Sequence, residues 1–191
     1  MNLARIFISA FLIDNIVFMR FIALCPFIGM STDDDKATGM GLAVIFVTTL
    51  ATSATWPVYK FILEPLGLTF LSILAFILII ASLVQLVEFY LKKSAPRLYN
   101  TMGIYFALIT TNCAIFAVVM ENISKNLSFI ESIVYALGVA SGFLLAMLLL
   151  AGIRRRIRTS PIPAFLKGTP ILFICACLLS VAFMGFSGLV K

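Results

Sequence analysis

The sequence has no histidine, and only 12% of its 191 residues are charged. The absence of imidazole removes the usual nitrogen ligand of zinc, copper or haem and the usual general base near neutral pH. Soluble domains carry about 25% charged residues. A chain with so few charges cannot cover a water-facing surface, so we expect lipid to contact most of its outer face.

Apolar residues make up 62% of the chain and give it a mean hydropathy of +1.15. A membrane-spanning helix needs roughly 20 predominantly apolar residues, and its backbone must satisfy its own hydrogen bonds in lipid. We therefore predict an all-α integral membrane protein with one transmembrane domain, residues 1–191, and no cleavable signal peptide. Six stretches are long enough to span: 3–24, 40–60, 69–91, 101–120, 130–152 and 170–189.

The basic residues orient these six stretches. Nine of the 14 Lys and Arg residues lie on the side that holds the loops after the first, third and fifth stretches, and four lie on the other side. The positive-inside rule places those three loops in the cytoplasm and both chain termini outside. The run Arg154–Arg158 is interpreted as an anchor on anionic headgroups or as a docking site for a soluble partner. Because the basic residues flank spans, we do not expect nucleic-acid binding.

Two cysteines indicate a weak internal repeat. Cys25 lies in FIALCPFIG and Cys113 in LITTNCAIF, 88 residues later (113 − 25 = 88). This spacing divides the chain into two halves of three spans, about 1–95 and 96–191. Halves with an odd number of spans have opposite orientations, and the sites of such inverted repeats lie near the bilayer midplane at interrupted helices. We expect interruptions in the first span, at Pro26, and in the fourth, at the polar sequence TTN.

The four cysteines form two pairs with different expectations. Cys175 and Cys177 face different sides of an apolar helix, so we expect them to pack as small hydrophobes. Cys25 and Cys113 are interpreted as packing residues, as a disulfide or as metal ligands. Thiolates without histidine favour iron–sulfur chemistry, and a cluster usually has four ligands. A cluster at this pair would therefore need two further cysteines from a second chain.

Several polar groups accompany the cysteines. Backbone N–H groups freed at the break around Pro26, and the side chains of Thr111 and Asn112, are candidate donors to cluster sulfurs, where hydrogen bonds tune the reduction potential. Asp14 is a separate case, because a charge at the bilayer centre costs about 2.5–3.5 kcal/mol on insertion scales. We interpret Asp14 either as part of an ion path or as a packed or interfacial residue.

The sequence resembles the A-subunit family of the Rnf complex over nearly its whole length, in the runs FIALCPFIGMS, GMGLAVIFVTTLA, LAFILIIASLVQLVE, ITTNCAIFAV and AFMGFSGLVK. A related subunit occurs in sodium-pumping NADH:quinone reductase. The resemblance implies a bacterial cytoplasmic-membrane complex that moves electrons between ferredoxin and NAD⁺ and couples this to Na⁺ or H⁺ translocation. It also implies a [2Fe–2S] cluster held by Cys25, Cys113 and two cysteines of the homologous, inverted E subunit.

The resemblance places the cluster between the iron–sulfur B subunit in the cytoplasm and the flavin of the G subunit outside, in a complex that also contains C and D subunits. The chain has no flavin-attachment sequence of the S-G-A-T type, so we expect no flavin on it. The alternative interpretation is an ion-conducting or scaffold subunit without a redox centre of its own.

Overall fold

The computed structural model describes residues 3–31, 34–66, 71–94, 108–161, 163 and 166–185, and every element in these ranges is helical. Helices satisfy their own backbone hydrogen bonds, as apolar segments in lipid require, and the predicted all-α class is confirmed. In chain order the elements are α1 (Leu3–Ile8), the π-helical turn η1 (Ser9–Ile13), α2 (Ile16–Arg20), α3 (Leu24–Met30), α4 (Asp34–Val58), the π-helical turn η2 (Tyr59–Leu63), α5 (Glu64–Leu66), α6 (Ser72–Ser94), α8 (Cys113–Ser124), α9 (Phe129–Arg158) and α10 (Thr169–Met184).

Several of these helices have the length or composition of membrane segments. Among the described residues, those long and apolar enough to cross a membrane are Asp34–Leu63, Ser72–Phe89 and Phe129–Arg158. Shorter apolar segments are Leu3–Ile13, Leu108–Ser124 and Thr169–Met184. All six overlap the predicted stretches. Residues 101–107 of the fourth stretch, the boundary between the halves near residue 95 and both chain termini lie outside the described residues.

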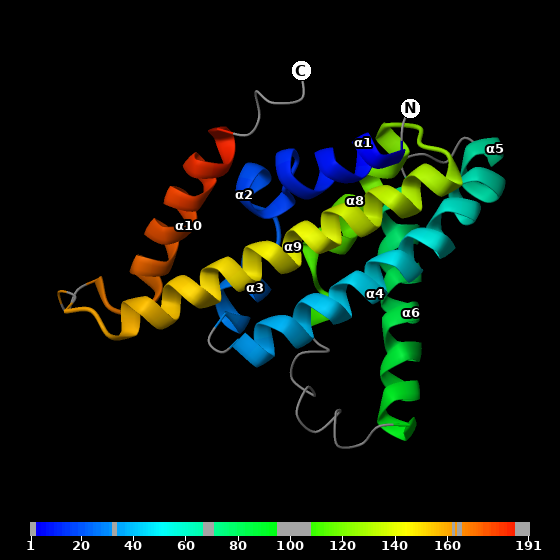
Figure 1. Ribbon diagram of the computed structural model, residues 1–191. Coiled ribbons are helices and arrows are strands. Elements are labelled where there is room, and N and C mark those ends of the chain that lie inside the picture. The colour runs from blue at the N-terminus through cyan, green and yellow to red at the C-terminus, as the bar shows by residue number, and fades with distance from the viewer. Residues whose placement is uncertain are drawn as a thin grey trace.

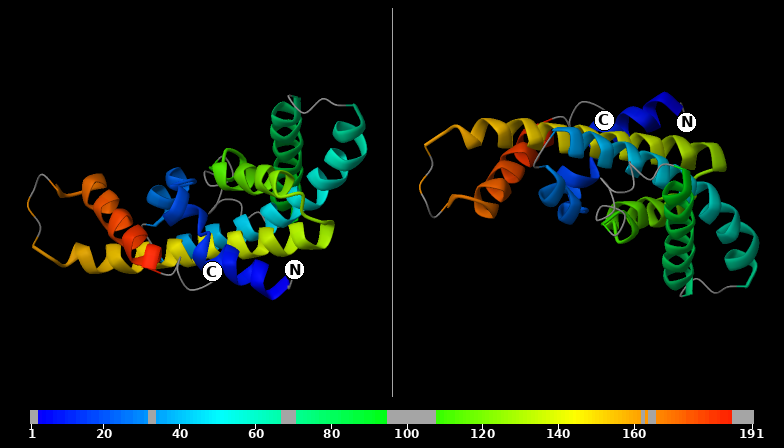
Figure 2. Two further views of the ribbon diagram at one scale, coloured as in Figure 1. Left: turned by 90° about the horizontal axis from the view of Figure 1, so that it is seen from above. Right: turned by 90° about the horizontal axis from the view of Figure 1, so that it is seen from below.

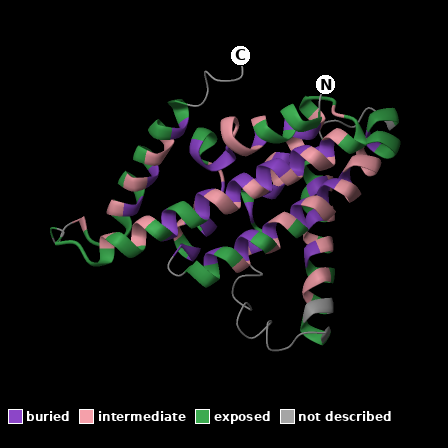
Figure 3. Cartoon of the chain, in the orientation of Figure 1, coloured by how far each residue is buried: buried purple, intermediate pink, exposed green. Residues whose placement is uncertain are grey.

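α4 and α9 form the centre of the molecule. They run side by side (Figure 1) and make its most extensive helix contact, and buried residues are concentrated along them (Figure 3). Gly41 allows this close approach, because a Cβ there would overlap the side chain of Leu144. α10 lies near one end of the pair, and α6 projects away from the other end (Figures 1 and 2).

The N-terminal segment crosses α9 at two glycines. A Cβ at Gly138 would lie 2.9 Å from the Cβ of Ala10, and a Cβ at Gly142 would lie 2.8 Å from the backbone oxygen of Phe11. Small residues let helix backbones approach closely in membranes. These contacts fix the position of the first span at the point where its helix is interrupted.

Candidate functional site

The first interruption lies at Asp14 and Asn15, between η1 and α2. Asn15 is fully buried, and its extended backbone (φ −60°, ψ 114°) turns the chain into α2. The backbone N–H of Val17 donates to the Asn15 side-chain oxygen at 3.1 Å, which caps the helix. The other side-chain atom, Nδ2, donates to the backbone oxygen of Gly142 at 3.0 Å. Asn15 thus holds the break against α9.

The second interruption repeats this geometry at Asn112. Its backbone is again extended (φ −71°, ψ 111°), and its side-chain oxygen accepts from the backbone N–H of Ala114 at 3.0 Å. Asn112 is buried, but its Nδ2 has no hydrogen-bond partner among the described residues. Cys113 is the first residue of the helix that this cap begins. The predicted interruption in the fourth span is therefore confirmed.

The two matching caps are separated by a different distance along the chain from that between the two cysteines. Asn15 and Asn112 are 97 residues apart (112 − 15 = 97), and the starts of α6 and α10 are also 97 residues apart (169 − 72 = 97). The predicted 88-residue spacing took the two cysteines as equivalent. Cys113 directly follows its cap, whereas Cys25 lies in the next helix, α3. The repeat itself stays a prediction.

The break beside Cys25 lies before it and not at Pro26. Phe21 and Ala23 have left-handed backbones (φ 53° and 66°), and α3 then begins at Leu24 with Pro26 as its third residue. The N–H groups of a first helical turn have no intrahelical partner, so a proline is tolerated there. The prediction that Pro26 interrupts the helix is wrong for this reason.

Cys25 and Cys113 occupy similar local environments. Both are exposed on this chain, and each lies in the first turn of its helix, α3 or α8. α3 and α8 lie on the same side of the α4–α9 pair (Figure 2). Among the described residues, no group of three or more His, Cys, Asp or Glu side chains could hold a metal ion.

A groove adjoins Cys113 between α6 and α8. It has a volume of about 350 Å³. Its lining is mainly apolar on the α6 side and polar at the break, where Thr110, Thr111 and Asn112 contribute. The Cys113 thiol donates to the backbone oxygen of Thr111 at 3.9 Å. The second cysteine is therefore open to a partner on the side where the helix is interrupted.

The C-terminal end of α3 is held by α9. Arg154 Nη1 donates to the backbone oxygen of Ile28 at 3.1 Å and to the hydroxyl of Ser31 at 3.2 Å. A cation at this position satisfies carbonyls that end a helix and complements its dipole. The sequence assigned the whole run Arg154–Arg158 to headgroups or to a partner. For Arg154 the structure shows a contact with the end of the helix that carries the first cysteine, and the interpretation of the run as an anchor or docking site stays a prediction.

A cluster of charged and polar residues joins the two interrupted spans. Arg20, at the end of α2, pairs with Glu121 of α8 at 2.7 Å. Lys125 pairs with the same carboxylate oxygen at 3.0 Å and lies 4.5 Å from the ring centroid of Tyr135, whose hydroxyl also interacts with Glu121. The sequence contains polar residues at these places but no signal that pairs Arg20 with a residue 101 positions away.

Asp14 borders this cluster. Its backbone N–H donates to the oxygen of Ser9 at 2.8 Å, which ends η1, and its half-buried carboxylate interacts electrostatically with Tyr135. The structure therefore places Asp14 within electrostatic range of Tyr135. A role for Asp14 in an ion path stays a prediction.

The other two cysteines lie on α10. Cys175 is partly buried and packs against the core, as predicted. Cys177 is exposed on this chain, so it does not pack within the described core. Residues two positions apart on a helix point to different faces, which is why Cys175 and Cys177 differ in exposure.

Comparison with known proteins gives consistent matches over almost the entire chain. Residues 3–190 match the family described as Rnf-Nqr subunit, membrane protein. The chain is 50% identical to the A subunit of the ion-translocating oxidoreductase complex of Syntrophotalea carbinolica, over 99% of this chain and 98% of the relative. It is 50% identical, with the same coverage, to the A subunit of the Na⁺-translocating ferredoxin:NAD⁺ oxidoreductase complex of Acetobacterium woodii. The corresponding A subunit of Cereibacter sphaeroides is 50% identical over 96% of this chain and 95% of the relative.

Proposed function

Because the chain belongs to the Rnf-Nqr family of membrane subunits, we propose that it is the A subunit of an ion-translocating ferredoxin:NAD⁺ oxidoreductase complex. Relatives at 50% identity carry this description over nearly their full length. The chain is then one part of a redox-driven translocase in a bacterial cytoplasmic membrane and is not catalytic alone. Its proposed topology has six spans in two inverted halves with both termini outside.

The placement of two cysteines supports a redox role. Cys25 and Cys113 are exposed, and each lies in a first helical turn after a break. The free N–H groups of such a turn favour negative charge. Beside Cys113, the buried Nδ2 of Asn112 has no partner among the described residues and is a further donor. This donor set fits a thiolate-bound [2Fe–2S] cluster, which supplies one-electron redox chemistry when bound.

A complete cluster requires a partner, since this chain contributes two ligands. In the proposed assembly the homologous E subunit, packed as an inverted pair with this chain, supplies two cysteines. The shared site lies between the B subunit on the cytoplasmic side and the flavin-bearing G subunit outside, with the C and D subunits completing the complex. The ion moved is Na⁺ or H⁺. Within this chain, Arg154 holds the end of the helix that carries Cys25, and Asn112 caps the helix that begins at Cys113.

Replacement of each cysteine by alanine tests the redox role. In the assembled complex we expect Cys25→Ala and Cys113→Ala each to remove the [2Fe–2S] signal in electron paramagnetic resonance and to lower the iron content. Cys177→Ala is the matched control, because Cys177 is also exposed but lies on α10. A cluster signal that survives either of the first two substitutions contradicts the proposal.

The polar cluster around Glu121 favours the second candidate, an ion-conducting or scaffold subunit without a redox centre. Charged residues inside membrane segments commonly mark ion pathways, and Arg20, Glu121 and Lys125 form linked ion pairs here. The same variants separate the two functions. A Cys25→Ala complex that kept full electron transfer but lost ion uptake would support the second candidate.

A further inference from the structure

Two polar side chains are buried where α4 packs against α8. Neither has a hydrogen-bond partner among the described residues. Asn122, in the last turn of α8, is 4% exposed and both atoms of its amide are unpartnered. Thr52 of α4 is 1% exposed and its Oγ1 is unpartnered. Native proteins retain few unsatisfied buried polar groups. The pair therefore needs an occupant that supplies the missing interactions.

The space between these side chains fits one small occupant. Thr52, Thr55 and Asn122 are among the residues lining a cavity of about 10 Å³, which is room for about one water-sized particle. The Thr55 hydroxyl donates to the backbone oxygen of Ala51 at 2.6 Å, so its own oxygen can only accept or coordinate. The cavity thus presents oxygen ligands from both helices.

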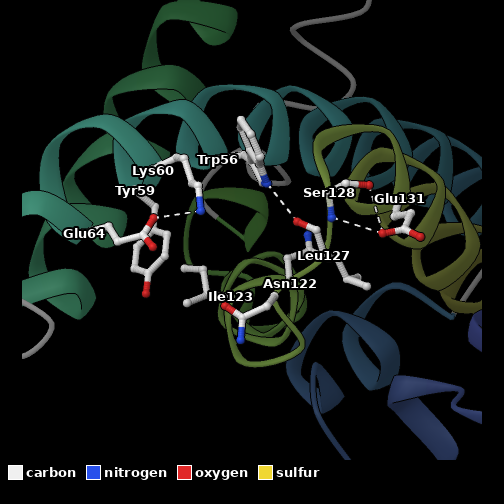
Figure 4. Close-up of a pocket in the computed structure, with 10 residues that line it drawn as sticks. Trp56, Tyr59, Lys60, Glu64, Asn122, Ile123, Leu127, Ser128 and Glu131 are labelled. Carbon is white, nitrogen blue, oxygen red and sulfur yellow. Dashed lines mark hydrogen bonds and ion pairs between the residues drawn. The ribbon is translucent and has the colours of Figure 1, made fainter.

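A larger pocket lies beside this cavity and shares lining residues with it. It has a volume of about 350 Å³, and Trp56 and Asn122 line both spaces. Figure 4 shows Asn122 across the pocket from Trp56 and Lys60. The charged residues in its lining are Lys60, Glu64 and Glu131. Lys60 pairs with Glu64 at 3.0 Å. With Glu131 also in the lining, the described charges sum to one net negative charge, which attracts cations.

The position of Asn122 in α8 also favours positive charge. α8 has 12 residues and ends at Ser124, so Asn122 lies in the last turn, where the helix dipole is negative. In transporters, the C-terminal ends of interrupted helices coordinate Na⁺ or H⁺. α8 is such a half-helix, because it begins at the Asn112 break.

We propose that Asn122 Oδ1 and Thr52 Oγ1 bind a small monovalent cation of the Na⁺ type, which enters through the pocket that Glu64 and Glu131 line. This proposal rests on the proposed function, because the cation that the complex translocates is the cation that would bind here. Neutral oxygen ligands suit a monovalent ion, because Ca²⁺ takes six to eight oxygens that include carboxylates. In the proposed topology the pocket faces the outside of the cell.

The single tryptophan of the chain reports on this site. Trp56 is the only one, lines both spaces and donates from its Nε1 to the backbone oxygen of Leu127 at 3.0 Å. The purified full-length chain in lipid nanodiscs, without any electron donor, is titrated with NaCl or with choline chloride at equal ionic strength. We expect a saturable change in fluorescence with NaCl only.

Variants assign this response to the cavity. Thr52→Val removes the unpartnered hydroxyl at constant shape, and we expect it to raise the half-saturating Na⁺ concentration about tenfold, as the loss of one charge-assisted contact does. Thr49→Val is the matched control on the same helix, because its hydroxyl already donates to the oxygen of Ile45 at 2.8 Å. Asn122→Asp keeps the size, adds a negative charge and lowers the half-saturating concentration.

Two outcomes overturn the proposal. A response that choline chloride reproduces, or no response to Na⁺ at all, shows that the cavity holds an ordered water only. A Na⁺ response unchanged in Thr52→Val and Asn122→Asp places the cation elsewhere. Since no electron donor is present, neither outcome bears on the cluster, and loss of the cluster in the cysteine variants leaves this titration unaffected. If a variant fails to fold, the wild-type titration with NaCl and choline chloride still tests the proposal.

Discussion

Arg154 is a single residue whose role differs from that of its chemically identical neighbour. It donates to Ile28 and Ser31 at the end of α3, whereas Arg155 is 78% exposed and pairs with Asp34. We expect Arg154→Gln to destabilise this region by about 2 kcal/mol, the magnitude of hydrogen bonds to a charged group, and to lower the iron content. Arg155→Gln removes the same charge from a surface pair and should have little effect.

The measurements for this pair of variants are thermal unfolding and iron per assembled complex. If both variants lost stability and iron equally, the contact with α3 would have no specific role and the run Arg154–Arg158 would act only through its charge. For single residues, the sequence identifies the basic run and predicts the side of the membrane on which it lies. It does not predict which of several adjacent arginines turns inward, because that depends on the position of α3 beside α9.

Asn122 illustrates the same limit on prediction from sequence. Its neighbour Glu121 and the cysteine motif stand out in an apolar run, but an asparagine near a helix end usually indicates a solvated turn or cap. Only packing against Thr52 shows that its amide is buried and unpartnered. The candidate cation site was therefore not predictable, whereas Cys25 and Cys113 were singled out by their motifs.

At the scale of elements, the contact between the first span and α9 depends on Gly142. A Cβ there would lie 2.8 Å from the backbone oxygen of Phe11 and 3.2 Å from Asn15 Nδ2. We expect Gly142→Ala to push the first span away and to cost about 1–3 kcal/mol, as overpacking does. Gly152→Ala, with nothing within 4 Å of the added Cβ, should be neutral or stabilising, because alanine favours helix. Melting temperatures in nanodiscs measure both, and a Gly142→Ala chain as stable as wild type contradicts the expectation.

The helical segments themselves were predictable, because continuous apolar runs of this length have few other solutions in lipid. Their internal breaks were predictable only in part. The TTN sequence indicates the break at Asn112, but in the first span the strongest breaker, Pro26, lies where proline does no harm. Asn15, an ordinary polar residue in sequence terms, sets that break through its cap and its bond to Gly142.

At the scale of the whole molecule, contacts between the two halves decide how the breaks are arranged. Asn15 bonds to Gly142 across 127 positions, Ser180 donates to the oxygen of Phe18 across 162 positions, and Arg20 pairs with Glu121 across 101. No local pattern encodes such pairs. They hold the first span against α8, α9 and α10.

The ion pair between the halves gives an asymmetric prediction. Glu121 is 7% exposed and balances both Arg20 and Lys125. In Arg20→Gln the carboxylate keeps its ion pair with Lys125, and the Arg20 side chain is half exposed, so we expect a loss below about 1 kcal/mol, as for exposed pairs. In Glu121→Gln two cations lose their counter-charge beside apolar spans, which is strongly unfavourable, and we expect a loss of about 2 kcal/mol or more.

Thermal unfolding of the chain in nanodiscs measures both variants, and the double variant completes the cycle. If Arg20 acts on stability mainly through Glu121, adding Arg20→Gln to Glu121→Gln should cost nothing further, because the interaction is already lost. The double variant should even recover some stability, since it removes one of the two unbalanced cations. A larger loss in Arg20→Gln than in Glu121→Gln, or fully additive losses in the double variant, would show that the two halves are not held together through this carboxylate.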